Sequence, residues 1–251
     1  MRDGVAAVLL DIDDTLVDTR AGFAAGMRAV AGVYLVHLGD DGPAAALEHW
    51  VSDPGGHFAA FTRGETSFEE QRRARAGRLH RDLGAVGLDE PGFTRWNLTY
   101  ETGFRDAWVA LPGAHELVVA LGAITPILPF GAVTNAQVDY QRDKLDRTGL
   151  GALPVLVGTD TLGIGKPDPR VFHHACLLLG VDPGRTVYIG NDLVVDAQAA
   201  VAAGLLGVWF DRGHEPVPML APVGLPVVRS LTELICWLGL SSGFGRSPVA
   251  R

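Results

Sequence analysis

Residues 5–17 read VAAVLLDIDDTLV, an apolar run that ends in a cluster of acidic residues. The apolar residues do not alternate with polar ones, which is typical of a strand buried on both faces of a parallel sheet. Asp11 then lies at the carboxyl end of that strand, with Asp13 and Asp14 just beyond it. Because ligands of open α/β sheets bind outside the carboxyl ends of the strands, this stretch predicts the fold and a place for function.

Short apolar runs of the same kind recur later in the chain, at residues 126–133, 153–157, 186–189 and 205–210. Helical stretches are expected beside them, at residues 137–148, 168–179, 193–203 and 231–238. Strands that alternate with helices in this way form right-handed crossovers. The fold class that we expect is therefore α/β, with a doubly wound, Rossmann-like parallel sheet.

Residues 18–111 have a different pattern, with helical periodicity, many Ala and Arg residues and no comparable apolar run. We expect a helical insertion here, with the α/β core formed by residues 1–17 and 112–240. Residues 241–251 are rich in Gly and Ser and are expected to form a flexible tail. Large aromatic residues of the insertion are expected to form its own small core rather than a cofactor site: Trp50, Phe58, Phe61, Trp96, Tyr100, Phe104 and Trp108.

The composition of the 251 residues, 47% hydrophobic and 20% charged, is that of a folded protein with a sizeable core. A formal net charge of -8 argues against broad binding of nucleic acid or of an anionic membrane. The two cysteines, Cys176 and Cys236, form no CxxC pair and indicate thiols in a reducing compartment. No signal peptide or membrane-spanning stretch is found, so a cytoplasmic protein with a small-molecule partner is expected.

The acidic residues Asp11, Asp13 and Asp14 crowd one turn, and their repulsion requires a cation or a shared proton. No His or Cys is nearby, so an all-oxygen site for Mg²⁺ is favoured. An aspartate of this kind is also a known nucleophile toward phosphorus. This turn is the first of four polar stations that follow predicted strands.

The second station is Thr134 with Asn135, which follow the apolar residues 130–133. A hydroxyl and an amide can donate hydrogen bonds to a phosphoryl oxygen. The same pair also suits the N-cap of a helix. Taken alone, this station favours the N-cap.

The third and fourth stations supply a cation and more acids. Lys166 lies in the turn GIGKPDP (residues 163–169), where it suits either a phosphoryl anion or solvent. Asp192 and Asp196 lie in GNDLVVD (residues 190–196). Asp192 can complete the magnesium sphere, and Asp196 can orient it, bind the metal through water or brace Lys166. Both residues also suit a helix cap and a first-turn acid. Each station has an alternative, but the four occur in order at the ends of successive strands, and together they predict one site.

This set of motifs resembles that of the haloacid dehalogenase superfamily, on its phosphatase side, with a helical (C1-type) cap as in phosphoglycolate phosphatases. The resemblance covers nearly the whole chain. The family's first motif is DxDx(T/V), the second a Thr or Ser, the third a Lys and the fourth acidic. The matching positions, in that order, are Asp11, Asp13 and Thr15; Thr134; Lys166; Asp192 and Asp196.

The resemblance implies hydrolysis of a phosphate monoester through an aspartyl-phosphate on Asp11. Asp13 would protonate the leaving alkoxide and then activate water. Thr134 and Asn135 would hold the phosphoryl group, and Lys166 would balance the negative charge.

For the cofactor, the resemblance implies Mg²⁺ bound by the Asp11 carboxylate, the Asp13 backbone carbonyl and Asp192. The run Gly190-Asn191-Asp192 departs from the family's usual Gly-Asp pair. Asn191 would face the metal if the loop were one residue longer. The spacing to Asp196 and the charge of the ligand favour Asp192.

The insertion would be a cap that closes over the strand ends and selects the substrate. Residues 62–70 lie about where related caps place a loop into the site, and Arg63 is the candidate contact for the leaving group. The arginine-rich run at residues 71–82 is accompanied by acidic residues, which indicates a solvated helix face rather than a nucleic-acid patch.

Alternative functions use the same residues. A phosphosugar mutase could use all four stations, whereas a 2-haloacid dehalogenase attacks carbon and would leave Asp13 without a proton to transfer. A noncatalytic scaffold is disfavoured because all the required residue types are present. The substrate among small phosphorylated metabolites, and whether the protein is a monomer or a homodimer, stay open.

Overall fold

A computed structural model describes residues 3–124, 128–151, 153–213 and 221–240. The chain divides into two compact units. The sheet unit comprises Met1–Val17, Ala110–Gly158 and Lys166–Arg251, and the helical unit comprises Asp18–Val109 and Thr159–Gly165. The division differs from the predicted domain boundaries chiefly in residues 159–165, which group with the helical unit. The predicted tail at residues 241–251 lies outside the described residues.

The sheet unit contains a six-stranded sheet in the order β3-β2-β1-β4-β5-β6. All neighbouring strands are parallel, which confirms the predicted doubly wound α/β sheet. The strands are β1 Ala7–Leu10, β2 Phe130–Val133, β3 Val155–Val157, β4 Thr186–Gly190, β5 Leu206–Phe210 and β6 Val227–Val228. Leu10 of β1 is level with Ala132 of β2 and Ile189 of β4, so the carboxyl ends of these three strands form one edge.

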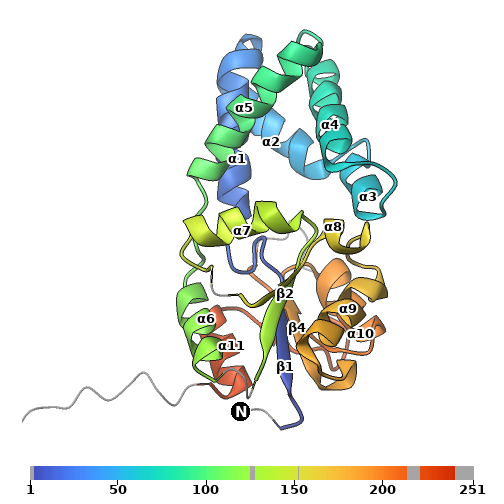
Figure 1. The fold of residues 1–251 in the computed structure, drawn as a ribbon. Coiled ribbons are helices and arrows are strands. Elements are labelled where there is room, and N and C mark those ends of the chain that lie inside the picture. The colour runs from blue at the N-terminus through green and yellow to red at the C-terminus, as the bar shows by residue number, and fades with distance from the viewer. Residues whose placement is uncertain (1–2, 125–127, 152, 214–220, 241–251) are drawn as a thin grey trace, which may run out of the picture. The chain divides into compact units, whose positions relative to one another are not determined.

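Helices cover both faces of this sheet (Figure 1), with α6 and α11 on one side and α9 and α10 on the other. Their bounds, with the remaining helices of the unit, are α6 Ala114–Ala123, α7 Val138–Arg147, α9 Pro169–Leu179, η2 Pro183–Arg185, η3 Leu193–Gln198, α10 Ala199–Ala202 and α11 Leu231–Leu238. Helix α7 lies beyond the carboxyl ends of the strands, across the top of the sheet in Figure 1.

The predicted helix at residues 193–203 is not uniform. Its first part, η3, is a π-helical turn, and only Ala199–Ala202 is α-helical. The backbone N–H groups of Asp196 and Ala197 both donate to the Asp192 carbonyl, at 3.1 and 3.2 Å. Such wide turns are frequent at functional sites, and this one directs Asp196 into the protein, where it is 2% exposed.

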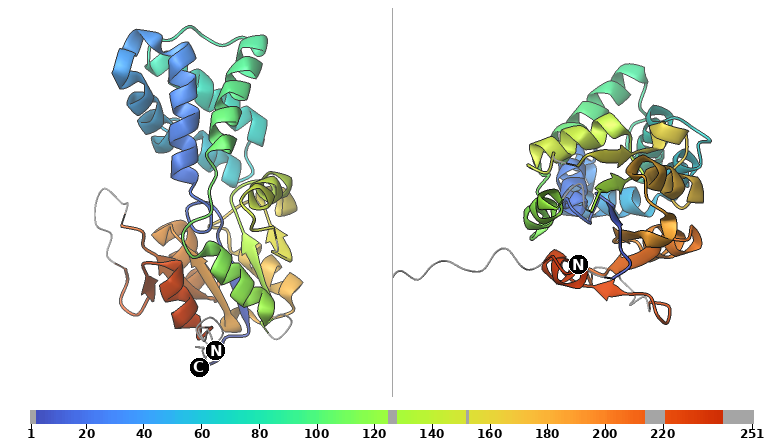
Figure 2. Two further views of the ribbon diagram at one scale, coloured as in Figure 1. Left: turned by 90° about the vertical axis from the view of Figure 1, so that its left-hand side faces the viewer. Right: turned by 60° about the horizontal axis from the view of Figure 1, so that its bottom comes forward.

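The helical unit is built from seven short and long helices: α1 Thr19–Tyr34, η1 Val36–Asp41, α2 Gly42–Ser52, α3 His57–Thr62, α4 Phe68–Asp82, α5 Glu90–Asp106 and α8 Thr159–Leu162. Helix α4 begins with a capping box in which Ser67 and Glu70 each bond the other's backbone. The two views in Figure 2 show these helices from other directions.

The predicted aromatic core of the helical unit is present, with one exception. Trp50, Trp96 and Tyr100 are fully buried and pack with ring centroids 5.0 to 5.6 Å apart. Phe61, Phe104 and Trp108 are also buried, whereas Phe58 is 36% exposed. Among the described residues, no helix has the length and the apolar character that a membrane crossing requires.

The prediction of a solvated face for residues 71–82 is wrong for two arginines. Arg72 is 7% exposed and the side chain of Arg75 is 12% exposed. The Arg75 guanidinium lies over the Trp50 ring, 3.9 Å from its centroid, where burial lowers its pKa to about 10. The aromatic rings accept these guanidinium groups as cation–π partners, an interaction that a periodicity pattern does not predict.

Candidate functional site

The candidate site begins where β1 ends. The backbone N–H of Asp11 still donates to the Ile189 carbonyl of β4, at 2.8 Å, so Asp11 is the first residue beyond the sheet. Its carboxylate is buried, with 4% of the residue exposed. The apolar strands thus fix the position of a charged side chain that they cannot themselves solvate.

Lys166 supplies the charge partner of Asp11. Its Nζ lies 2.6 Å from Asp11 Oδ1 and 2.7 Å from Asp196 Oδ1, and it is 4% exposed. Burial raises the pKa of Asp11 to about 7, although the Lys166 ammonium acts in the opposite direction. Burial lowers the pKa of Lys166, but the charges of Asp11 and Asp196 outweigh it and raise that pKa well above its usual value. One shared ammonium therefore only partly offsets the burial of Asp11.

Asp196 and Tyr188 hold this lysine in place. Asp196 Oδ2 accepts from the backbone N–H of Asp192 at 3.0 Å, and Tyr188 Oη lies 2.9 Å from Lys166 Nζ and 3.1 Å from Asp196 Oδ1. A Cβ on Gly190 would lie 2.3 Å from Asp196 Cγ, so only glycine admits the acid here. Tyr188 was missed from the sequence because it lies in an apolar strand run, although a phenol at a functional strand end was a usable signal.

Thr15 connects Asp11 to the fourth station. Its Oγ1 lies 3.1 Å from Asp11 Oδ2 and 3.3 Å from Asn191 Oδ1. Asp192 is exposed, and its Oδ1 accepts from the backbone N–H groups of Val194 and Val195, both at 2.8 Å. The structure therefore brings Asn191 next to Asp11 and uses Asp192 as the cap of η3. The sequence preference for Asp192 as the metal ligand stays a prediction.

The donor set at this place suits a hard cation. The oxygens Asp11 Oδ2 and Asn191 Oδ1 converge, since both lie within reach of one hydroxyl. Within the described ranges there is no group of three or more His, Cys, Asp or Glu side chains that could hold a metal. An all-oxygen set with few protein ligands fits Mg²⁺, which keeps several of its waters.

Asp13 has a separate charge partner that was not predicted from the sequence. Lys144 of α7 forms an ion pair with Asp13 Oδ1, and Gln141 Nε2 donates to Asp13 Oδ2 at 2.7 Å and to Thr134 Oγ1 at 2.9 Å. Lys144 and Gln141 are buried, whereas a third of the Asp13 side chain is exposed. Their spacing was the available signal, because two polar residues three positions apart lie on one face of the helix that follows Thr134.

Asn135 has a different contact from the predicted one. Its Nδ2 donates to the Lys166 carbonyl at 2.9 Å, and its Oδ1 accepts from the Lys166 backbone N–H at 2.7 Å. Both ends of the amide thus hold the backbone of the lysine turn. The neighbouring Thr134 is 1% exposed and is joined through Gln141 to Asp13.

The third acid of the turn, Asp14, is also paired. Its Oδ1 lies 3.0 Å from Nη1 of Arg212. Asp11, Asp13 and Asp14 therefore have three separate cationic partners, and the repulsion predicted from the sequence is offset within the chain itself.

Arg63 belongs to the helical unit, whereas the residues of this site belong to the sheet unit. Its guanidinium forms two bonds to the Glu65 carboxylate, at 2.6 and 2.7 Å, and both side chains are more than half exposed. A substrate that used Arg63 would have to compete with Glu65. The role of Arg63 in specificity stays a prediction.

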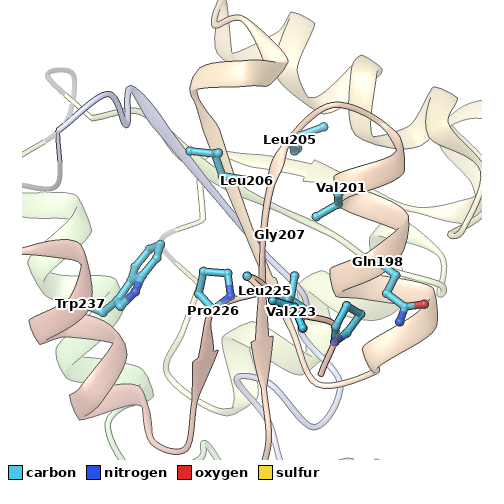
Figure 3. A pocket seen from close by; sticks show the side chains of 11 residues that line it. Gln198, Val201, Leu205, Leu206, Gly207, Val223, Leu225, Pro226 and Trp237 are labelled. Atoms are coloured by element: carbon cyan, nitrogen blue, oxygen red, sulfur yellow. The ribbon is translucent and has the colours of Figure 1, made fainter. Parts of the chain in front are cut away.

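A different hollow of the sheet unit has a volume of about 470 Å³ and lies at the amino-terminal end of β5, away from the carboxyl edge (Figure 3). Its walls are mainly apolar, with Val201, Leu206 and Trp237 among them and Gln198 at the rim. None of the described residues that line it has a carboxylate or amine side chain. The chemistry-bearing residues are therefore gathered at the carboxyl edge.

Comparison with known proteins places this geometry in a family. The chain matches the family model described as haloacid dehalogenase-like hydrolase over residues 5–204. It is 38% identical over 90 residues to a phosphoserine phosphatase of Thermus thermophilus, a match that covers 36% of each chain. It is 46% identical over 94 residues to a phosphoglycolate phosphatase of Xylella fastidiosa, covering 36% of this chain and 41% of that protein. The chain thus spans less than half the length of either relative.

Among solved structures, YfnB of Bacillus subtilis bound to magnesium matches with a TM-score of 0.74 and 21% identity, over 94% of this chain and 99% of that one. A solved dehalogenase matches with a TM-score of 0.72 and 21% identity, over 94% of this chain and 98% of that one. At these identities the likeness shows a shared fold.

Proposed function

We propose that this chain, which belongs to the haloacid dehalogenase-like hydrolase family, hydrolyses the phosphate monoester of a small metabolite. Asp11 is the nucleophile and Asp13 the general acid and base. One observation carries the proposal: two aspartates two residues apart each have a buried lysine of their own. Only a reaction with an acid/base step in addition to the nucleophilic step needs the second aspartate.

In the first step the Asp11 carboxylate attacks phosphorus while the ester P–O bond breaks. Asp13 gives its proton to the leaving oxygen, and an aspartyl-phosphate forms on Asp11. The Lys166 ammonium, 2.6 Å from Asp11, stabilises the negative charge around the phosphoryl group. Because the Thr134 hydroxyl accepts from Gln141, its own proton stays available for a phosphoryl oxygen.

In the second step Asp13, now a carboxylate, takes a proton from water. The resulting hydroxide attacks phosphorus, the bond between Asp11 and phosphorus breaks, and phosphate leaves. Asp13 has then regained its proton and Asp11 its charge, so the site is ready for another turnover.

Magnesium, when bound, supplies a hard cation that offsets the charge of nucleophile and phosphoryl group. We infer that Asp11, Asn191 and the backbone carbonyl of Asp13 would hold it. The contact between Thr15 and both Asp11 and Asn191 supports Asn191, and the capping bonds of Asp192 argue against that residue. Asn191→Ala should raise the Mg²⁺ concentration for half-maximal activity about tenfold, whereas Asp192→Asn should change it little.

The substrate class follows from the family and from the relatives named as phosphatases of phosphoserine and phosphoglycolate. We infer a small phosphorylated metabolite, with the helical unit as a cap over the site and Arg63 as a contact for the leaving group. A cytoplasmic location fits Cys176 and Cys236, which are both free thiols.

Dehalogenation is the second candidate, because a dehalogenase shares the fold. Its attack on carbon releases a halide, which needs no proton. Phosphate ester hydrolysis is favoured because Asp13 lies two residues after the nucleophile and is a third exposed, where it can exchange the proton that a leaving alkoxide needs. Transfer to a second hydroxyl, as in a mutase, would show as an isomerised phosphate rather than free phosphate.

The test is steady-state hydrolysis of p-nitrophenyl phosphate and a panel of phosphorylated metabolites with Mg²⁺. We expect release of phosphate that EDTA stops and that Asp11→Asn abolishes. Asp192→Asn, a matched removal of a carboxylate from the same edge, should keep most of the activity. Chloride release from a 2-chloro acid without any phosphate release would replace the proposal by dehalogenation.

A further inference from the structure

Helix α7 carries two buried polar residues on one face. Gln141 and Lys144 are 0% and 1% exposed, and residues three apart lie on the same side of a helix. Arg142, between them in sequence, is exposed. The helix therefore buries an amide and an amine against the carboxyl edge of the sheet, where the catalytic pair proposed above lies.

Both groups converge on one carboxylate. Lys144 Nζ pairs with Asp13 Oδ1, and Gln141 Nε2 donates to Asp13 Oδ2 at 2.7 Å. A carboxylate oxygen that carries no proton can only accept, so the Gln141 amide must present its nitrogen. The same nitrogen donates to Thr134 Oγ1 at 2.9 Å. One amide thus ties the acid/base residue to the hydroxyl that holds the phosphoryl group.

This arrangement is not explained by stability alone. The Oε1 atom of Gln141 is buried and has no hydrogen-bond partner among the described residues. An unpaired buried acceptor destabilises a fold. We therefore attribute the buried amide of Gln141 to the two hydrogen bonds that its nitrogen donates, to Asp13 and to Thr134.

The use of lysine in the chain gives an independent argument. The sequence has nineteen arginines and only two lysines, Lys144 and Lys166. Both are buried, and each forms an ion pair with one of the two aspartates, Asp13 and Asp11. A lysine is a compact point charge, whereas the planar fork of an arginine needs several acceptors. The chain therefore departs from its usual basic residue only at these two acids.

We propose that Gln141 and Lys144 are positioning residues that hold the Asp13 carboxylate at a fixed place relative to the phosphoryl site. The inference rests on the proposed function. The two donors hold both carboxylate oxygens of Asp13, and a third of its side chain is exposed, so their loss should weaken the hold on its rotamer. General acid catalysis requires the acid within hydrogen-bond reach of the leaving oxygen, and a displaced Asp13 loses that reach.

The test compares two esters in the presence of Mg²⁺. An alkyl phosphate needs its leaving oxygen protonated, whereas p-nitrophenolate leaves with little help. Because kcat/KM reports steps up to release of the leaving group, it isolates the acid step. We expect Lys144→Met to lower kcat/KM about 100-fold for the alkyl ester and less than about fivefold for p-nitrophenyl phosphate. Gln141→Leu should act in the same direction by about tenfold.

Controls separate positioning from folding. Arg142→Met removes an exposed charge from the same helix and should leave both values unchanged. Lys144→Arg keeps the charge and should restore part of the loss for the alkyl ester. If Lys144→Met does not fold, by circular dichroism, Gln141→Leu and Lys144→Arg still decide the matter.

Two results would overturn the inference. Equal losses for both esters in every Lys144 and Gln141 variant would mean a structural role only. Wild-type protein that hydrolyses neither ester would overturn the proposed function and this inference with it, so the two failures are distinguishable.

Discussion

Positive charge has different partners in the two units. In the helical unit it is carried by arginines: Arg72, for example, pairs with Glu101, bonds Asn97 at 3.2 Å and lies 4.8 Å from the centroids of two aromatic rings. At the carboxyl edge of the sheet unit the two lysines meet the proposed catalytic acids, as Lys166 meets Asp11, and Arg212 meets Asp14. We therefore expect the arginines of the helical unit to act on stability and the two lysines to act on the proposed reaction.

Removal of a basic residue should have a different effect in each unit. Loss of a lysine at the sheet edge should change turnover first, whereas loss of an arginine in the helical unit should change the free energy of unfolding first. Turnover and the free energy of unfolding, measured for the same variants, test whether the two sets of basic residues act separately.

The largest effect is expected for Lys166→Met. Without the ammonium, Asp11 and Asp196 face each other as unpaired buried acids, and the phosphoryl group loses its charge partner. We expect kcat for p-nitrophenyl phosphate to fall about 10,000-fold, equivalent to ~5 kcal/mol. Steady-state kinetics on folded protein measures this. Lys166→Arg should stay nearly as slow, because the site is only 4% exposed; a fully active arginine variant would break the comparison.

The next effect concerns the pH dependence of stability. The pKa of Asp11 is about 7 in the folded protein and 3.8 in the unfolded chain, so the folded state binds this proton more tightly. Its stabilising contribution is full below about pH 4 and is lost as the pH rises toward 7, on the order of 4 kcal/mol in all. Urea unfolding in EDTA across this range measures it. The loss should vanish in Asp11→Asn, whose amide stays neutral; identical slopes would contradict the assignment.

For the helical unit, Arg72→Met should lower the free energy of unfolding by about 2 kcal/mol, because the largely buried Glu101 loses its pair with Arg72 and keeps the one with Arg105. The kcat of the protein that remains folded should change less than about threefold. Urea unfolding and kinetics on one preparation test both statements. Arg72→Met combined with Glu101→Leu should recover part of the loss, and a variant that unfolds normally but turns over slowly would reverse the roles of the two units.

The smallest effect is expected for Arg73→Met. Arg73 of α4 pairs with Glu69 of the same helix and with Glu90 of α5, and all three side chains are more than a third exposed. Exposed pairs contribute little, so neither the unfolding midpoint nor kcat should change measurably. A clear drop in the midpoint would mean that the surface network matters as much as the buried one.

The sheet was predictable because strands that are buried on both faces of a parallel sheet consist of consecutive apolar residues. Strands β1, β2, β3 and β5 fall within the predicted runs, and β4 extends one residue beyond its run. Strand β6 has only two residues, too few for a pattern. The aromatic core of the helical unit was predictable for the same reason, since large apolar side chains are buried wherever the chain allows.

The fourth station was less predictable. Its spacing is compatible with either Asn191 or Asp192 facing Asp11, and only the capping bonds of Asp192 separate the two. The contacts of Asn135 were equally invisible, because its partner Lys166 lies far along the chain.

Buried charges were the main source of error. Lys144 and Gln141 look like part of a solvated helix face, as do Arg72 and Arg75. A periodic pattern records which residues are apolar, but it does not say which polar residues meet a carboxylate or an aromatic ring after folding. Those pairings depend on contacts between segments distant in sequence.

The two hydrogen bonds of Asn135 to the backbone of Lys166 have a mechanical consequence. Gly165, the residue before, belongs to the helical unit, and its N–H donates to the Thr62 carbonyl at 2.7 Å. Residues 165 and 166, neighbours in the chain, thus belong to different units and have separate hydrogen-bond partners. Because Asn135 binds both backbone polar groups of Lys166, it fixes the backbone position from which the Lys166 ammonium reaches Asp11.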